Sequence, residues 1–276
     1  MSEKRVSSST NERHSSDYVV EQGWERYTNE DHAIWKTLFT CQSKLVQNRA
    51  CREFVSGLGA LDVSADSIPR FEKISEILYT LTKWRIVAVP GLVPDDVFFN
   101  HLAKRQFPAT NWIRRREQMD YLQEPDIFHD VFGHVPLLAN PIFGDYLEAY
   151  GKSGRKAFTL NALPFLARLY WYTVEFGLIN TKDGLRIYGS GIVSSRKETI
   201  ACLKDQNPKR VAFDLKRVMR TKYKIDDLQP IYFVVKSFES LFEETCSDFT
   251  AIYEELRRQP EIEPCALIQS DILISI

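Results

Sequence analysis

Residues 124–136 read EPDIFHDVFGHVP, and this stretch places two histidines, His129 and His134, among apolar side chains. A glutamate, Glu175, follows further along the chain inside the aromatic run YWYTVEFGL (170–178). Two imidazoles and one carboxylate are the ligand set of non-haem Fe(II) oxygenases, in which this facial triad leaves coordination positions open for dioxygen and a co-substrate. The two segments therefore predict a metal-dependent oxygenase.

The i,i+5 spacing of the two histidines does not suit a regular α-helix. With about 3.6 residues per turn, the two side chains would point in well-separated directions. We therefore expect a helix end or a local distortion here, which Gly133 would permit. The zinc-protease motif H-E-x-x-H differs, because its i,i+4 spacing places both histidines on one helix face. The alternative is a pair of ordinary histidines with hydrogen-bond partners.

Glu175 lies in so apolar a segment that burying its ionised carboxylate would be costly without a compensating cation. A divalent metal would supply that cation. The alternative is a glutamate that pairs with an arginine or points to solvent at the helix end. The other histidines, His14, His32 and His101, have no comparable surroundings, and we expect them to be structural or exposed.

Composition excludes several classes of partner. The chain has 276 residues, enough for one large domain or two modest ones. Its 36 basic and 37 acidic residues nearly cancel, so no overall field attracts nucleic acid or an anionic membrane. The polar start lacks the apolar core of a secretory signal, and no apolar run approaches the ~18 residues of a membrane helix. We therefore expect a soluble, cytoplasmic protein that binds neither nucleic acid nor membranes.

The five cysteines are scattered, and no two of them form a C-x-x-C pair. An odd number without close spacing argues against a disulfide framework and against a zinc ribbon. We expect reduced thiols, most of them structural.

The hydrophobic pattern predicts one compact domain that is mainly α-helical with small β elements. Residues 1–17 are polar and are expected to form a disordered tail, which leaves residues 18–276 as the domain. Asp126 is available to cap the helix that carries the histidines. The expected helices cover residues 29–57 (or to Gly59), 70–81, 95–104, 163–176 and 240–257. The expected strands cover residues 85–89, 185–193 and 231–235.

Two polar clusters have both a structural and a functional interpretation. The run Arg114–Arg116 is ordinary if it faces solvent, yet arginine is the residue best shaped to hold a carboxylate through two parallel hydrogen bonds. The second cluster consists of Ser194, Ser195 and Glu198, and its structural interpretation is the capped start of a helix. Neither cluster alone decides between a structural and a functional role.

Four segments together resemble the pterin-dependent aromatic amino acid hydroxylases, and most of all the single-domain bacterial members that hydroxylate phenylalanine. They follow one another in the order and at the spacing of that family, and a weaker resemblance extends from about residue 27 to residue 256. The segments are YLQEPDIFHDVFGHVPLL (121–138), ARLYWYTVEFGL (167–178), YGSGIVSSRKE (188–198) and LQPIYFVVKSF (228–238).

The resemblance implies a role for thirteen residues, together with Fe(II), tetrahydrobiopterin or a related tetrahydropterin, and O2 as co-substrate. The implied iron ligands are His129, His134 and Glu175. The implied substrate-binding residues are Arg114, Trp171, Phe176, Ser194 and Glu198. The implied pterin-binding residues are Gly91, Leu92, Phe98, Asp130 and Tyr170.

The activity that the resemblance implies is hydroxylation of L-phenylalanine to L-tyrosine, a phenylalanine 4-monooxygenase. Trp171 is similar to the phenylalanine and tyrosine types, since the tryptophan type has phenylalanine there. Ile225 is unlike the acidic residue of the tyrosine type. Tryptophan 5-hydroxylation or broad specificity remains the alternative within the family. A zinc-dependent hydrolase and a helical binding protein with a structural metal remain alternatives from other classes.

The resemblance also bears on organisation and partners. The regulatory domain and the tetramerising helix of the family have no counterpart in the sequence, so a monomer or dimer is expected. Besides the amino acid substrate, the expected partners are metabolic: separate enzymes would recycle the oxidised pterin.

Overall fold

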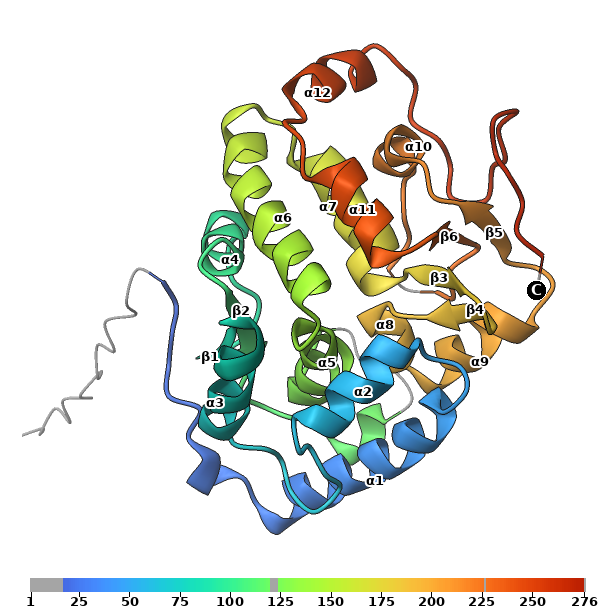
Figure 1. Cartoon of the computed structure of the whole chain (residues 1–276). Helices are drawn as coiled ribbons and strands as arrows, with labels where there is room; N and C mark the ends of the chain where they lie inside the picture. Colours follow the sequence, from blue (N-terminus) through green and yellow to red (C-terminus); the bar gives the residue numbers. More distant parts are fainter. Residues whose placement is uncertain (1–16, 120–123, 226, 276) are drawn as a thin grey trace, which may run out of the picture.

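The computed structural model describes residues 17–119, 124–225 and 227–275 (Figure 1). The expected disordered tail falls almost wholly on residues 1–16, which lie outside the described residues, as do residues 121–123 of the first family-like segment. Helices predominate and the strands are short, so the predicted fold class is confirmed. None of the helices in the described ranges combines the length and the apolar character that crossing a bilayer requires.

The first helices form one side of the molecule, with α1 along its lower edge in Figure 1. They follow the short 3-10 turn η1 (Trp24–Arg26) and are α1 (Asn29–Val46), α2 (Arg52–Ala60) and α3 (Phe71–Thr82). Thr28 caps α1 in a reciprocal capping box with Asp31. The prediction of one helix over residues 29–57 is wrong. Asn48 adopts a left-handed conformation, and the Cys51 amide donates to the Ile187 carbonyl at 2.8 Å, which ends α1 and starts α2 in a new direction.

A parallel pair of strands lies beside these helices. The pair consists of β1 (Arg85–Val89), which was predicted, and β2 (Gln106–Thr110), which was not, with α4 (Asp95–Leu102) between them. Pro108 in β2 cannot donate a ladder hydrogen bond, which hides the strand in the sequence. The end of β2 contacts the helix that bears the histidines.

The centre of the molecule is helical and contains two π-helical turns. Its elements are η3 (His129–His134), α5 (Val135–Leu138), α6 (Pro141–Thr159), α7 (Leu163–Tyr170) and η4 (Trp171–Glu175); the short 3-10 turn η2 (Arg116–Gln118) precedes them. The two turns η3 and η4 are π-helices. Behind η3, the stacked rings of Phe128 and Phe132 lie 4.9 Å apart, and Trp35 of α1 packs edge-on against Phe128. This aromatic packing fixes η3 against the N-terminal helices.

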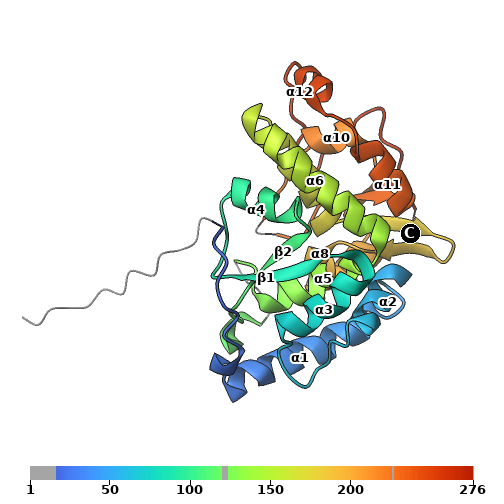
Figure 2. The same cartoon turned by 60° about the vertical axis from the view of Figure 1, so that its left-hand side comes forward.

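A four-stranded sheet in the order β4-β3-β6-β5 forms the other side (Figures 1 and 2). Its strands are β3 (Leu178–Thr181), β4 (Gly184–Ile187), β5 (Lys209–Ala212) and β6 (Ile231–Val235). Between and after them lie α8 (Ser190–Val193), α9 (Arg196–Lys204), α10 (Leu215–Arg220), α11 (Phe238–Thr245) and α12 (Thr250–Leu256). The strand expected over residues 185–193 is therefore half right, and the helix expected over 240–257 is two helices.

The last residues extend this sheet instead of forming a unit of their own. Ile274 donates from its backbone amide to the Arg210 carbonyl at 2.9 Å, beside β5. The buried ion pair between Arg217 and Asp271, 2.8 Å from Nε to Oδ1, fixes the segment against α10. All five cysteines are free thiols, in agreement with the expectation from their spacing.

Candidate metal centre

The two histidines lie at the ends of the π-helical turn η3. The hydrogen bonds of a π-helix run from residue i to residue i+5, so residues five apart come onto one face. The two Nε2 atoms are accordingly 3.2 Å apart. The predicted local distortion is confirmed, and its form explains why the spacing is five residues and not four.

Gly133 has a different role from the one expected. Its backbone is not in the left-handed region, so the π-helical turn does not depend on the conformational freedom of glycine. A Cβ at this position would lie 3.0 Å from the carbonyl oxygen of Ser190. Glycine thus allows α8 to approach η3 closely, and α8 supplies the groups that support the metal ligands.

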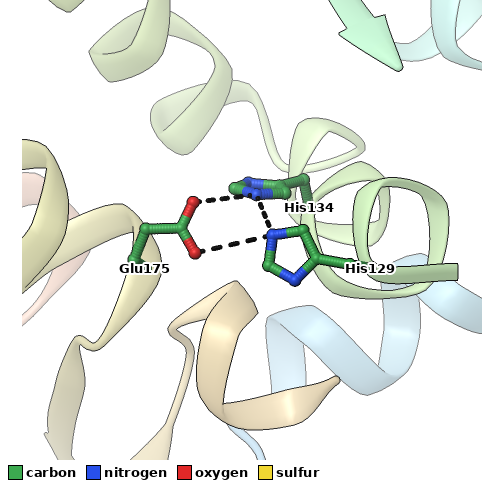
Figure 3. A group of neighbouring side chains, drawn as sticks. All are labelled: His129, His134 and Glu175. Atoms are coloured by element: carbon green, nitrogen blue, oxygen red, sulfur yellow. Dashed lines mark hydrogen bonds and ion pairs between the residues drawn. The ribbon is translucent and has the colours of Figure 1, made fainter. Parts of the chain in front are cut away.

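Glu175 ends the second π-helical turn, η4, and its carboxylate faces both imidazoles (Figure 3). Oε1 lies 3.1 Å from Nε2 of His134, and Oε2 lies 3.6 Å from Nε2 of His129. Metal–ligand bonds of about 2.0–2.2 Å place neighbouring donors roughly 3 Å apart. The three side chains therefore fit around a single ion without rearrangement of the backbone.

Two serines of the α8 region orient these ligands. The Ser190 carbonyl can only accept, so Ser194 Oγ donates to it at 2.7 Å and must accept the Nδ1 proton of His129 at 2.9 Å. This tautomer leaves the lone pair on Nε2, where a metal would bind. Ser190 Oγ donates to Glu175 Oε2 at 2.9 Å. Such outer partners fix the orientation and raise the basicity of metal ligands.

The protonation states suit a metal site. Burial lowers the pKa of His129 to about 4, so its imidazole is neutral at neutral pH. Burial by itself would oppose ionisation of Glu175, but the two nearby imidazoles and Ser190 outweigh it and hold its pKa at about 2. A neutral imidazole and a carboxylate are the forms that bind metals.

The described residues bring three His, Cys, Asp or Glu donors together here, with their ligand atoms within 4.8 Å of one another. A structural metal site would use four protein ligands. Three donors on adjoining edges fit a facial triad that keeps coordination positions open. His32 and His101 lie elsewhere: His32 Nδ1 accepts the Ile68 amide proton, and His101 is buried beside Gln106. His14 lies outside the described residues.

Arg114 is buried and paired with a residue that the sequence suggested only as a helix cap. Its Nε and Nη2 donate to the two carboxylate oxygens of Asp126, each at 2.8 Å. Asp126 does cap the helix, since Oδ1 accepts the His129 amide proton at 3.0 Å. Although burial opposes its ionisation, Arg114 lowers the pKa of Asp126. Nη1 of Arg114 has no hydrogen-bond partner among the described residues and is available to a ligand.

Trp171 and Phe176, the two residues implied for the substrate ring and called the aromatic wall below, lie next to each other. The rings of Trp171 and Phe176 lie 4.7 Å apart, and Tyr223 stacks on Trp171 at 4.4 Å. Trp171 Nε1 donates to Gln229 Oε1 at 2.9 Å. Tyr223 and Gln229 were not among the predicted site residues, because both lie in an irregular segment without a periodic signal.

Glu198 is buried at the start of α9, where Ser195 caps the helix as the sequence suggested. Its Oε1 accepts from the Tyr232 hydroxyl at 2.6 Å and from the Gln229 amide at 3.1 Å. Burial raises the pKa of Glu198 despite these donors.

The residues implied for pterin lie in the turn after β1 and on α4, η3 and α7. Asp130 accepts from the amide and hydroxyl of Thr110 at 2.7 and 2.9 Å, and burial raises its pKa to about 7. Tyr170 stacks with His134 at 6.2 Å and meets Phe98 edge-on at 5.7 Å. Gly91 and Leu92 follow β1; Leu92 is exposed, and a Cβ on Gly91 would meet open space. Their roles stay predictions.

Comparisons with known proteins show the family of the chain. The sequence model of the biopterin-dependent aromatic amino acid hydroxylases matches residues 15–263. Phenylalanine-4-hydroxylase of Chromobacterium violaceum is 59% identical over 242 residues, 88% of this chain and 82% of that protein. The corresponding protein of Caulobacter vibrioides is 56% identical over 259 residues, 94% of this chain and 88% of that protein.

Solved structures give the same result. The chain is similar to the iron- and phenylalanine-bound structure of the C. violaceum enzyme, with a TM-score of 0.90, 54% identity and 94% of each chain covered. It is also similar to the structure of that enzyme with iron(III) and oxidised 7,8-dihydrobiopterin, with a TM-score of 0.91, 55% identity, and 95% of this chain and 94% of that chain covered. Since the family model matches most of its length and these relatives are more than half identical, this chain belongs to the biopterin-dependent aromatic amino acid hydroxylases.

Proposed function

We propose that this chain is a phenylalanine 4-monooxygenase, which hydroxylates L-phenylalanine to L-tyrosine with Fe(II), a tetrahydropterin and O2. The observation that carries the proposal is the convergence of His129, His134 and Glu175 from two π-helical turns. The named function of the C. violaceum and C. vibrioides relatives supports the substrate. A zinc hydrolase and a structural-metal protein have no support from this family.

We assign His129, His134 and Glu175 as the ligands of Fe(II), because two neutral nitrogens and one carboxylate leave an open face on the ion. When bound, the iron and the tetrahydropterin supply the reduction of O2 that ring hydroxylation requires. The chain contributes by holding donors, substrate and pterin in place and by excluding water. Ser194 accepts the Nδ1 proton of His129, so the lone pair of Nε2 stays available for the metal.

Arg114 is proposed to hold the substrate carboxylate. Asp126 occupies its Nε and Nη2 and so fixes the plane of the guanidinium, while Nη1 remains available. We assign Glu198 and Ser194 to the backbone end of the amino acid substrate. The hydroxyl of Ser194 already binds His129, so we propose that Ser194 lies beside the substrate without donating a hydrogen bond to it. An amino acid fixed at its backbone end presents its ring in one orientation, which converts binding energy into positioning.

Trp171 and Phe176 are proposed to line the ring of the substrate. For the pterin, Phe98 and Tyr170 offer aromatic faces, Asp130 offers a carboxylate, and the exposed turn at Gly91 and Leu92 offers backbone groups. The aromatic side chains among these residues would help to keep water from the reacting atoms.

Further assignments follow from the same function. We propose residues 18–276 as one catalytic domain, a monomer or dimer in the cytoplasm, with separate enzymes that recycle the oxidised pterin. Nucleic acid is not a proposed partner, because the charges of the chain nearly cancel.

One assay tests the proposal. Purified protein loaded with Fe(II) receives tetrahydrobiopterin and O2 together with phenylalanine, tryptophan and tyrosine in competition, and the products are resolved by chromatography. We expect tyrosine as the main product, with none formed when the metal, the pterin or O2 is left out. Preferred formation of 5-hydroxytryptophan would move the assignment to the alternative within the family. Hydrolytic activity of a zinc-loaded form without O2 or pterin would overturn it.

A further inference from the structure

Resting on the proposed function, we propose that Gln229 is a positioning residue for the substrate ring. It links the aromatic wall to the backbone-binding end of the site, and we expect it to set how efficiently pterin oxidation is converted into hydroxylated product. Gln229 lies just before β6 and is almost fully buried, with 1% of its surface exposed. It belongs neither to the metal ligands nor to the residues assigned to touch substrate or pterin.

The side chain of Gln229 makes three hydrogen bonds, and they join two parts of the structure. Oε1 accepts the indole proton of Trp171 at 2.9 Å. Nε2 donates to the carbonyls of Lys224 and Asp227 at 3.0 and 3.2 Å. Both amide hydrogens and one lone pair of the carboxamide are therefore engaged. The amide plane cannot rotate without breaking several of these bonds, so the indole nitrogen of Trp171 is held in a fixed direction.

The same residue reaches the opposite end of the site through its backbone. The Gln229 amide donates to Glu198 Oε1 at 3.1 Å, and the Tyr232 hydroxyl donates to the same oxygen at 2.6 Å. These donors fix Oε1 and leave Oε2 of Glu198 without a hydrogen-bond partner among the described residues. One buried residue thus contacts both the ring wall and the proposed backbone-binding carboxylate.

The stacking of Tyr223 on the Trp171 indole shows why the hydrogen bond from Trp171 to Gln229 is important. Tyr223 stacks on Trp171 with its plane 16° from parallel, and Tyr223 comes from the segment whose carbonyls Gln229 binds. Trp171 is half-buried, and its neighbour Phe176 meets it at a tilt of 37°. Stacking alone permits a ring to slide in its plane, whereas a hydrogen bond at the ring edge fixes its rotation. Gln229 supplies that constraint.

Loss of the hydrogen bond between Gln229 and Trp171 should affect the orientation of the substrate ring and not the chemistry at the metal. If the wall can shift, the phenyl ring has more than one orientation, and the ring carbon to be hydroxylated spends less time in place. Misplacement of a reacting group by about 1 Å costs up to roughly 100-fold in rate. We therefore expect less tyrosine per tetrahydropterin oxidised and a higher KM for phenylalanine, with iron binding and the KM for pterin unchanged.

A double-mutant cycle tests the inference with the full-length, iron-loaded protein. Gln229→Met keeps the length of the side chain and removes all three hydrogen bonds, and Trp171→Phe removes the indole donor. The control is Gln22→Met, since Gln22 also joins two backbone groups, the Pro69 carbonyl and the Phe71 amide, at 2.8 Å each, without a partner in the site. For each variant, tyrosine formed per pterin oxidised, both KM values, iron content and phenylalanine binding by calorimetry without pterin are measured.

We expect Gln229→Met to lower the yield of tyrosine per pterin at least twofold and to weaken phenylalanine binding about tenfold, the size of effect that a lost buried hydrogen bond produces. In the Trp171→Phe background the same change should have a clearly smaller effect, because the shared interaction is already absent. Gln22→Met should lower the melting temperature only. Full additivity of the two changes, an unchanged yield, or the same loss of yield in Gln22→Met would overturn the inference.

The design separates this inference from the proposed function. If the unmodified protein binds phenylalanine but forms no tyrosine, the proposed function fails while the calorimetric cycle still decides the role of Gln229. If the unmodified protein does not bind phenylalanine, both fail. If it forms tyrosine and the cycle is additive, only the inference about Gln229 is lost.

Discussion

The metal end of the site, formed by His129, His134 and Glu175, and the aromatic wall share one π-helical turn, since Trp171 begins η4 and Glu175 ends it. Different parts of the chain hold these two residues in place. Glu175 is fixed by Ser190 of α8, a short helix packed tightly against η3. Trp171 is fixed by Gln229 and Tyr223, which belong to an irregular segment before β6. The proposed metal donors are thus supported by packed helices, whereas Trp171, which we propose to line the substrate ring, is held by an irregular segment.

Loss of a metal ligand should have the largest effect and should be confined to the metal end. Glu175→Ala or His134→Ala removes one of three donors, so we expect iron retention and hydroxylation to fall more than 100-fold, beyond the roughly 10–100-fold typical of outer-shell changes. Metal analysis and product chromatography measure both quantities, and circular dichroism should show a retained fold. Normal turnover of an iron-reconstituted variant would refute the ligand assignment.

The packing that supports the metal end can be tested at a matched pair of glycines in α2. A Cβ on Gly57 would lie 2.0 Å from the Pro136 carbonyl oxygen, just after His134, whereas a Cβ on Gly59 would meet open space. We expect Gly57→Ala to lower the free energy of unfolding by about 3 kcal/mol, the upper end for overpacking against a rigid neighbour. Gly59→Ala should raise it by up to about 1 kcal/mol, because alanine is the better helix former. Denaturant unfolding distinguishes the two, and equal effects would contradict the packing argument.

A change at Arg114 should act on substrate binding and leave the metal unaffected. Arg114→Lys keeps the charge beside Asp126 and avoids leaving that carboxylate unpaired, but it loses the planar fork that holds two carboxylates at once. We expect the KM for phenylalanine to rise about 10–100-fold, the equivalent of a lost charged hydrogen bond, with little change in the KM for pterin. Steady-state kinetics at saturating pterin provide the measurement. An unchanged KM for phenylalanine would remove Arg114 from the site.

Two adjacent serines offer a finer test of the metal end. Ser194→Ala removes the acceptor for the His129 Nδ1 proton and should weaken iron binding about tenfold. Ser195→Ala removes the cap of α9 and should cost about 1 kcal/mol of stability with no effect on iron affinity. Competition with a chelator measures the affinity and thermal melting the stability. If both variants lose iron equally, the hydrogen bond to His129 is not what orients the ligand.

The smallest effect is expected far from both regions. Hydrogen bonds from Lys152 and Arg105 lower the pKa of Glu148 although its partial burial opposes ionisation. The pKa of Glu148 is therefore lower in the folded than in the unfolded state. Its interactions with Lys152 and Arg105 contribute stability above about pH 4.5, and this stability is lost as the pH falls through the folded-state pKa. Glu148→Gln should cost less than about 1 kcal/mol at pH 7 and nothing at low pH. Unfolding curves at both pH values check this, and a pH-independent cost would show that packing is responsible.

Errors in the predicted elements occur where a distant contact decides the local structure. The apolar pattern continues from α1 into α2, but the Cys51 amide binds Ile187 at the end of β4, and this contact is invisible in the local sequence. The strand β2 was missed for a similar reason, because its sequence contains Pro108 and its pairing partner β1 lies on the other side of α4 in the chain. By contrast, β1 and β6 were located from short β-branched runs bounded by turn residues.

The sequence alone pointed to the donor set, because a metal would offset the cost of burying a glutamate in an apolar helix beside two apolar-flanked histidines. It also determined the need for a distorted turn, since five residues do not fit an α-helix. Only the folded chain shows which groups orient those donors, because Ser190 and Ser194 reach Glu175 and His129 from the α8 region. It also shows the pairing of Arg114 with Asp126 and of Trp171 with Gln229. Hydrogen bonds between distant segments leave no periodic trace in a sequence, because they depend on where packing places each chain segment and not on residue spacing.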